Sequence, residues 1–74
     1  MKITYDPEVD AAYIYLMEDP GEVTTVKANE RVFLDYGAAD ELVGIEILDA
    51  SKVLGFDREH PEIKIDKVLS VCPA

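Results

Sequence analysis

The chain has 74 residues, of which seven are basic and sixteen acidic, so its formal net charge at pH 7 is −9. Such a charge repels the phosphates of nucleic acids and anionic membrane surfaces, which argues against a protein that binds either of them. A chain of this length corresponds to one domain, residues 1–74, that buries only about 60% of the surface its unfolded form exposes. Because 49% of the residues are hydrophobic, we expect the domain to fold, and we expect assembly into a homo-oligomer, a dimer in the first instance, to add stability.

Cys72 is the single cysteine, so the chain can form neither an internal disulfide nor a cysteine cage for a metal. The N-terminal stretch MKITYDPEVD lacks the apolar core of a signal peptide, and no run approaches the roughly 18 to 20 apolar residues that a membrane helix needs. These features predict a cytoplasmic protein that does not enter a membrane.

Three strands are predicted in the first half of the chain. The first covers residues 2–5 and ends at an Asp-Pro pair that favours a turn. The second covers residues 11–18 and contains the unbroken apolar run YIYLM, which is typical of a strand covered on both faces. An Asp-Pro-Gly turn signal follows, and the β-branched residues of segment 22–28 predict the third strand.

The most informative pattern lies in residues 31–51. Apolar residues alternate with other residues on both sides of Gly37, which predicts a β-hairpin made of the fourth and fifth strands. Asp49 stands where its side chain would cap a short helix over residues 50–54, and Gly55 stands where a left-handed helix end is usually found.

A last strand is predicted over residues 62–65. The predicted fold class is therefore α+β and mainly β, as a small antiparallel meander of five to six strands with one short helix after the fifth strand. Tyr13, Tyr15 and Met17 would share one face of the second strand, to be covered by the helix, by the C-terminal segment or by another subunit. Because aromatic side chains with a polar tip are enriched at interfaces, these three residues are the predicted interface, with intramolecular cover as the open alternative.

Two stretches carry a family resemblance: ITYDPEVDAAYIYL near the N-terminus and LVGIEILDAS after the glycine turn. In this order they resemble the small prokaryotic family catalogued as domain of unknown function 2283, and the likeness covers residues 3–54. The resemblance implies a compact β-rich fold without an agreed activity. It also implies an antitoxin or accessory role, because some relatives are thought to lie beside toxin-like partners.

Two groups of carboxylates are candidate metal sites. Asp6, Glu8 and Asp10 alternate as in the first half of a calcium-binding loop, but Ala11 and Met17 occupy the positions where that loop needs a glycine and a bidentate glutamate. These carboxylates are therefore expected to cap a turn.

The second group mixes imidazole with carboxylates: Asp57, Glu59, His60 and Glu62. This is the ligand set of a divalent metal or of an acid–base pair. Four close neighbours in a turning segment cannot all point inward, so a solvated loop is expected unless a dimer axis brings two copies of His60 together.

A nucleophilic enzyme would need a base beside an activated hydroxyl or thiol. Here His60 alone would have to serve Ser51, Ser70 or Cys72, and no elbow motif presents any of them. The chain also lacks a glycine-rich phosphate loop. The sequence thus predicts no catalytic residue and no cofactor.

The expected role is a non-enzymatic protein-binding module that forms homo-oligomers and binds a basic protein, in the manner of an antitoxin. One alternative is a small metal-binding protein or metal-dependent hydrolase that uses Asp57, His60 and Glu62. Another is a structural subunit that assembles only with itself.

Overall fold

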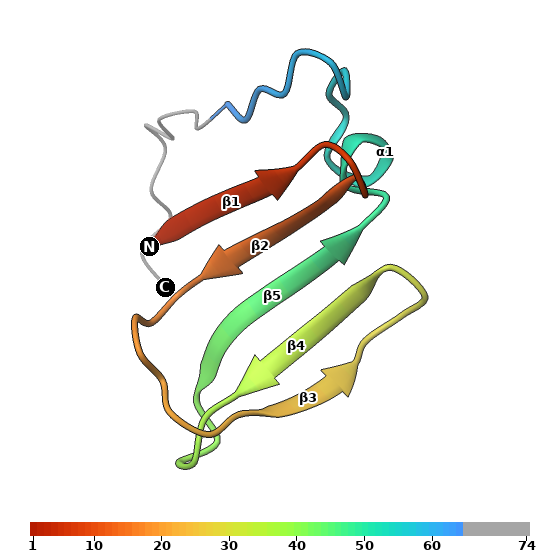
Figure 1. The fold of residues 1–74 in the computed structure, drawn as a ribbon. Coiled ribbons are helices and arrows are strands. Elements are labelled where there is room, and N and C mark those ends of the chain that lie inside the picture. Colours follow the sequence, from red (N-terminus) through yellow and green to blue (C-terminus); the bar gives the residue numbers. More distant parts are fainter. Residues whose placement is uncertain (65–74) are drawn as a thin grey trace, which may run out of the picture.

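The computed structural model describes residues 1–64 of the chain, in which five antiparallel strands form one sheet and a short helix follows the fifth strand. The elements are β1 (Lys2–Asp6), β2 (Ala11–Tyr15), β3 (Thr24–Lys27), β4 (Val32–Tyr36), β5 (Leu42–Leu48) and α1 (Ala50–Leu54). This confirms the predicted fold class, with five strands and the helix in the expected place (Figure 1).

The strand order in the sheet is β1-β2-β5-β4-β3 (Figure 1). Short connections join β1 to β2 and lead from β3 through β4 to β5, whereas residues 16–23 carry the chain from β2 to the far edge. The two segments of the family resemblance therefore meet at the centre of the sheet, where Ile14 of β2 lies opposite Ile45 of β5.

The pairing register divides the side chains of the sheet between two faces. One row crosses all five strands and is wholly apolar: Ile3, Ile14, Ile45, Leu34 and Val26. A second row on the same side consists of Tyr5, Ala12, Ile47 and Val32. We call the side formed by these two rows the apolar face. The other side, the tyrosine face, carries Tyr13 and Tyr15 among mostly polar residues: Lys2, Thr4, Thr25, Lys27, Phe33, Asp35 and Glu46.

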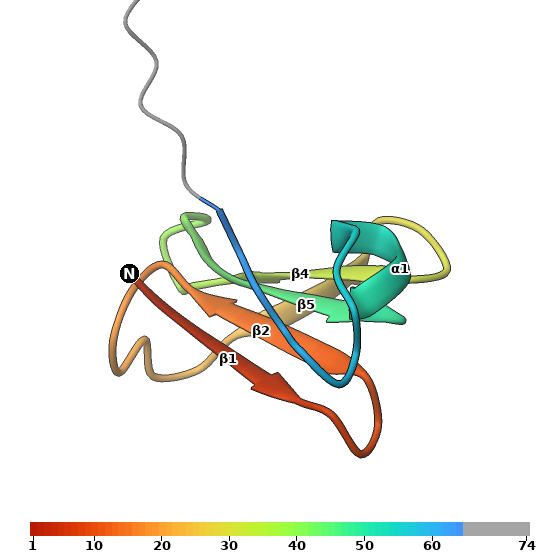
Figure 2. The same cartoon turned by 90° about the horizontal axis from the view of Figure 1, so that it is seen from above.

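The helix α1 covers one end of the apolar face (Figure 2). Ala50 is fully buried against Ala12 and Ile47, and beyond the helix Phe56 meets Tyr5 edge to face, with ring centroids 4.9 Å apart. The prediction that the helix could cover the tyrosine face is wrong, because a left-handed turn at Asp49 (φ 51°) brings Ala50 onto the side of Ile47.

Two predicted strands are shorter than expected. β2 ends at Tyr15 rather than at Glu18, because the N–H groups of Leu16 and Met17 both donate to the carbonyl of Val43 and the regular ladder stops there. Met17 therefore lies beyond the strand, while Tyr13 and Tyr15 share a face as predicted. β3 likewise occupies only Thr24–Lys27 of the predicted segment 22–28.

The predicted last strand over residues 62–65 is wrong in its described part, since residues 62–64 form no strand. Pro61 lacks a backbone donor, and the segment passes over the apolar face, where Pro61 and Ile63 line a hollow of about 340 Å³ together with Ile3 of β1. Ile65, Ser70 and Cys72 lie outside the described residues.

Candidate functional site

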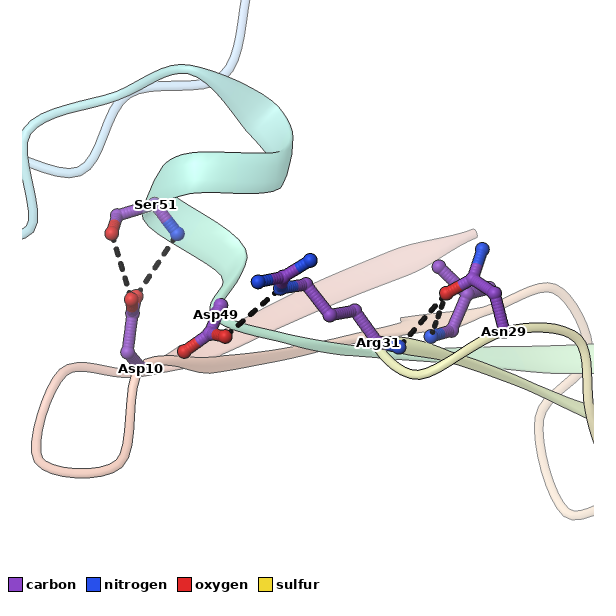
Figure 3. Close-up of polar contacts among 6 residues, drawn as sticks. Asp10, Asn29, Arg31, Asp49 and Ser51 are labelled. Carbon is purple, nitrogen blue, oxygen red and sulfur yellow. Dashed lines mark hydrogen bonds and ion pairs between the residues drawn. The ribbon is translucent and has the colours of Figure 1, made fainter.

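The turn between β1 and β2 is joined to α1 by one carboxylate. The side chain of Asp10, only 6% exposed, accepts hydrogen bonds from the backbone N–H of Ser51 at 3.0 Å and from its hydroxyl at 2.7 Å (Figure 3). The hydroxyl of Tyr5 donates to the same carboxylate at 2.6 Å, and the Asp10 carbonyl accepts the N–H of Ala50 at 2.9 Å. Asp10 thus fills the role of helix cap from a distant part of the chain.

The sequence predicts that Asp49 caps α1 with its side chain, and this prediction is wrong. Asp49 stands at the N-cap position, but its side chain makes no capping hydrogen bond. It instead accepts the Nε–H of Arg31 at 3.0 Å, on the exposed side of the joint (Figure 3). The left-handed backbone at Asp49 places Ser51, rather than the cap residue, beside the only nearly buried carboxylate among residues 1–64.

These contacts shift two pKa values in opposite directions. The hydrogen bond from Tyr5 holds the pKa of Asp10 below its ordinary value, and the two hydrogen bonds from Ser51 add to this effect against the cost of burial. Burial, together with the hydrogen bond to Asp10, raises the pKa of Tyr5 to about 12. Asp10 is therefore an ionised structural group at neutral pH, with its oxygens already occupied.

The two predicted groups of carboxylates do not converge. Asp6 accepts the N–H of Glu8 at 3.0 Å in a local turn, while Asp10 points to α1. In the second group, Nδ1 of His60 lies 3.5 Å from an oxygen of Asp57, and both side chains are exposed. Within residues 1–64 no three His, Cys, Asp or Glu side chains are arranged to hold a metal ion.

Asp57, His60 and Glu62 do border one hollow, of about 660 Å³, formed with Phe56 and the end of α1. Glu62 lies 3.8 Å from the ammonium of Lys64 in the same segment. This hollow brings the three residues near one another without a shared ligand position.

The tyrosine face is held together by polar contacts of its own. The Tyr13 hydroxyl donates to Asp35 of β4, and the Thr25 hydroxyl donates to the other oxygen of that carboxylate at 2.5 Å. Burial and the contact with Asp35 raise the pKa of Tyr13 to about 12. The ring of Tyr13 lies over Gly44, where any side chain would overlap it, and packs at 4.4 Å against Tyr15.

A third surface lies at the end of the sheet where the connections after β2 and after β4 meet (Figure 1). We call residues 16–23 and 37–42 the loop end. It exposes four large apolar side chains: Leu16, Met17, Val23 and Leu42. It also carries five acidic residues: Glu18, Asp19, Glu22, Asp40 and Glu41.

The ion pairs lie elsewhere. Within residues 1–64 three ion pairs, Lys27–Glu30, Arg31–Asp49 and Glu62–Lys64, are found beside the contact between Asp57 and His60. None of them includes a residue of the loop end, so the negative charge of this surface is balanced by no ion pair in the part of the chain that the structure describes.

Two carboxylate contacts, those of Asp10 and Asp35, are not visible in the sequence, because their partners are 41 and 22 residues away. The loop end is not visible in the sequence either, although its apolar and acidic residues can be read from it. They occupy two segments, and only the strand order shows that these segments meet.

A family model described as "Protein of unknown function (DUF2283)" matches residues 2–51 of the chain. The match extends from β1 through β5 to the first residues of α1, and it includes both Asp10 and Ser51. No curated protein and no solved structure matches the chain. No helix among the described residues is long and apolar enough to cross a membrane.

Proposed function

The chain belongs to the DUF2283 family of proteins of unknown function, and we propose that it is a non-enzymatic protein-binding module whose loop end binds a basic protein. The observation that carries the proposal is the combination of four exposed apolar side chains with five acidic residues in the two connections that meet at this end of the sheet. Exposed apolar residues that gather within a polar rim are typical of interaction sites.

Charge and apolar contact would contribute differently to such a complex. An ion pair at an exposed rim contributes about 0 to 1 kcal/mol, so the carboxylates of the loop end would mainly select a basic partner and speed its approach. Most of the affinity would come from burying Leu16, Met17 and their apolar neighbours, at about 25 cal/mol per Å². The preferred partner surface is therefore basic and apolar together, rather than merely basic.

A synthetic amphipathic peptide of lysine and leucine, compared with oligolysine of equal charge, tests this preference by titration. We expect the amphipathic peptide to bind more tightly, with an affinity that falls as salt rises, because screening shortens the reach of charges to about 8 Å at physiological ionic strength.

A matched pair of double variants locates the binding surface. Glu18→Gln with Glu22→Gln removes two charges from the loop end, and Glu8→Gln with Glu59→Gln removes two exposed charges from the opposite end of the molecule. Only the first pair is expected to weaken peptide binding, by about tenfold. Equal weakening by both pairs would mean that net charge alone attracts the peptide, and the proposal would fail.

A further inference from the structure

Residues 1–64 cover the apolar face over only part of its width. α1 contacts β2 and β5 and, in the part of the chain that the structure describes, neither β3 nor β4. On the uncovered part, Val26 of edge strand β3 is 46% exposed, and Leu34 and Val32 of β4 are only partly buried. A bare apolar strip thus runs along β3 and β4.

The other part is covered by α1 and by residues 61–64, and α1 is itself incompletely packed. Ala50 faces the sheet, but Val53 and Leu54 of the same helix are 44% and 40% exposed. One side of the sheet therefore carries an apolar projection at α1 and a bare apolar strip at β3 and β4. Both features expose apolar side chains, and α1 does not contact β3 or β4 of its own chain within residues 1–64.

We propose that a second copy of this chain covers the apolar face, with α1 of each copy resting on the β3–β4 strip of the other. A twofold axis relates the two copies and produces this contact twice. Val53 of each copy then meets Val26 of the other copy. The inference goes beyond the proposed function, because it concerns a second surface and does not depend on what the loop end binds.

Charge favours a copy of the chain over a basic protein at this face. The row from Ile3 to Val26 contains no charged side chain, so a basic partner would find no carboxylate there to pair with. Two chains that each carry a formal charge of −9 repel one another, and this repulsion is smallest where the facing surfaces carry no charged side chains. The apolar face provides such a surface.

Area explains why the helix must take part. Five strands spaced about 4.8 Å apart and about five residues long span roughly 20 by 17 Å, or about 340 Å² of flat sheet. A stable interface buries about 800 Å² on each partner. The sheet alone falls short of this area, and α1 and residues 61–64 already cover part of it. A stable dimer therefore requires that α1, with its exposed Val53 and Leu54, packs onto the partner as well.

The test uses the full-length chain, two exposed positions and native mass spectrometry. Wild type is expected at twice the chain mass of 8.2 kDa. Val26→Lys and Val53→Glu each introduce a charge at an exposed site, where folding is little affected, and each is expected to weaken the dimer at least tenfold. Mixed in equal amounts, the two variants are expected to form a heterodimer, because the ammonium introduced in one then faces the carboxylate introduced in the other.

The matched control is Thr4→Glu, which places the same charge at an exposed position of the other edge strand on the tyrosine face. This variant is expected to remain dimeric, and a mixture of Thr4→Glu with Val26→Lys is expected to yield no heterodimer above that of Val26→Lys with wild type. The loop-end variant Glu18→Gln with Glu22→Gln is expected to stay dimeric too, which separates this inference from the proposed function.

Three results would overturn the inference. A monomeric wild type would leave the apolar face to residues 65–74 or to a different protein. A dimer broken by Tyr15→Lys but not by Val26→Lys would place the interface on the tyrosine face. A Val26→Lys and Val53→Glu mixture that stays monomeric would show that α1 and β3 do not meet across the axis.

Discussion

The carboxylate of Asp10 and the backbone N–H and hydroxyl of Ser51, 41 residues apart in the chain, are joined by hydrogen bonds of 3.0 and 2.7 Å. This contact attaches the β1–β2 turn to the start of α1 and fixes the helix over Ala12 and Ile47. Since the described core is small, a single polar joint of this kind has a large share in holding the helix to the sheet.

Substitution at Asp10 should therefore destabilise the protein more than substitution at Asp49. Asp10→Asn keeps the shape of the side chain but removes the negative charge that strengthens the hydrogen bonds from Tyr5 and Ser51, and it replaces one accepting oxygen by a donor. Asp49→Asn removes only an exposed pair with Arg31. Both residues have positive φ, which asparagine tolerates, so the two variants are matched. Urea unfolding should show a loss below about 1 kcal/mol for Asp49→Asn and a clearly larger one for Asp10→Asn. A larger loss of stability for Asp49→Asn than for Asp10→Asn would mean that Asp49, and not Asp10, caps the helix.

The stability of the protein should fall in acid because of the same joint. The pKa of Asp10 lies below the ordinary value of 3.8 in the folded state, so its contribution is present above that value and is lost as pH falls through the lower folded pKa. The stability difference between wild type and Asp10→Asn should therefore shrink below about pH 4. A constant difference from pH 7 to pH 2, measured by urea unfolding, would contradict an ionised Asp10.

Two tyrosines should make the protein sensitive to strong base. The folded-state pKa values of Tyr5 and Tyr13 are raised to about 12 from 10.0, so the stabilisation by their protonated hydroxyls is complete below pH 10 and is lost as pH rises toward 12. Tyr5→Phe and Tyr13→Phe should each flatten this alkaline loss, measured by circular dichroism. Tyr36→Phe is the control. An equal effect of that variant would contradict the assignment of the alkaline loss to Tyr5 and Tyr13.

Gly44 should resist substitution because of Tyr13. Alanine normally stabilises a strand relative to glycine by about 0.5 to 1 kcal/mol, but here its methyl group would overlap the Tyr13 ring and displace the hydroxyl from Asp35. Gly44→Ala should therefore cost about 1 to 3 kcal/mol in wild type. In a Tyr13→Ala background the same change should cost little, and a double-mutant cycle measures this coupling. Additive losses would show that the two residues do not interact.

The segment with Asp57 and His60 should not depend on metal. Its side chains are exposed, and none of the described His, Cys, Asp and Glu residues form a group of three that could hold an ion. Dialysis against a chelator should leave the melting temperature unchanged, and His60→Ala should behave as wild type does. Stoichiometric zinc in the purified protein that His60→Ala removes would instead support the metal-binding alternative.

The strands and the helix could be predicted because their signals are local. Alternation on both sides of Gly37 identified β4 and β5, and the left-handed Gly55 ends α1 with its N–H bonded to the Ser51 carbonyl, as expected for a helix stop. The helix cap could not be predicted, because Asp49 and Asp10 have the same residue type and only the fold decides which of them reaches Ser51.

The loop end and the uncovered part of the apolar face could not be predicted either, because both depend on the strand order. Nothing local in residues 16–23 indicates that they cross to the far edge of the sheet, and this crossing is what brings Met17 and Val23 to the same end as Leu42. The doubly apolar pattern of the second strand drew attention to Tyr13 and Tyr15. In the folded chain the Tyr13 hydroxyl donates to Asp35, and the apolar strip that residues 1–64 leave uncovered lies on the opposite face, along β3 and β4.

Native mass spectrometry of the chain purified at low salt from its own source tests the proposed function most directly. We expect a complex of this chain with a basic protein, which dissociates in high salt and is weakened in the Glu18→Gln, Glu22→Gln variant. Species at multiples of 8.2 kDa alone, with no second protein at low salt, would contradict a protein-binding role for the loop end.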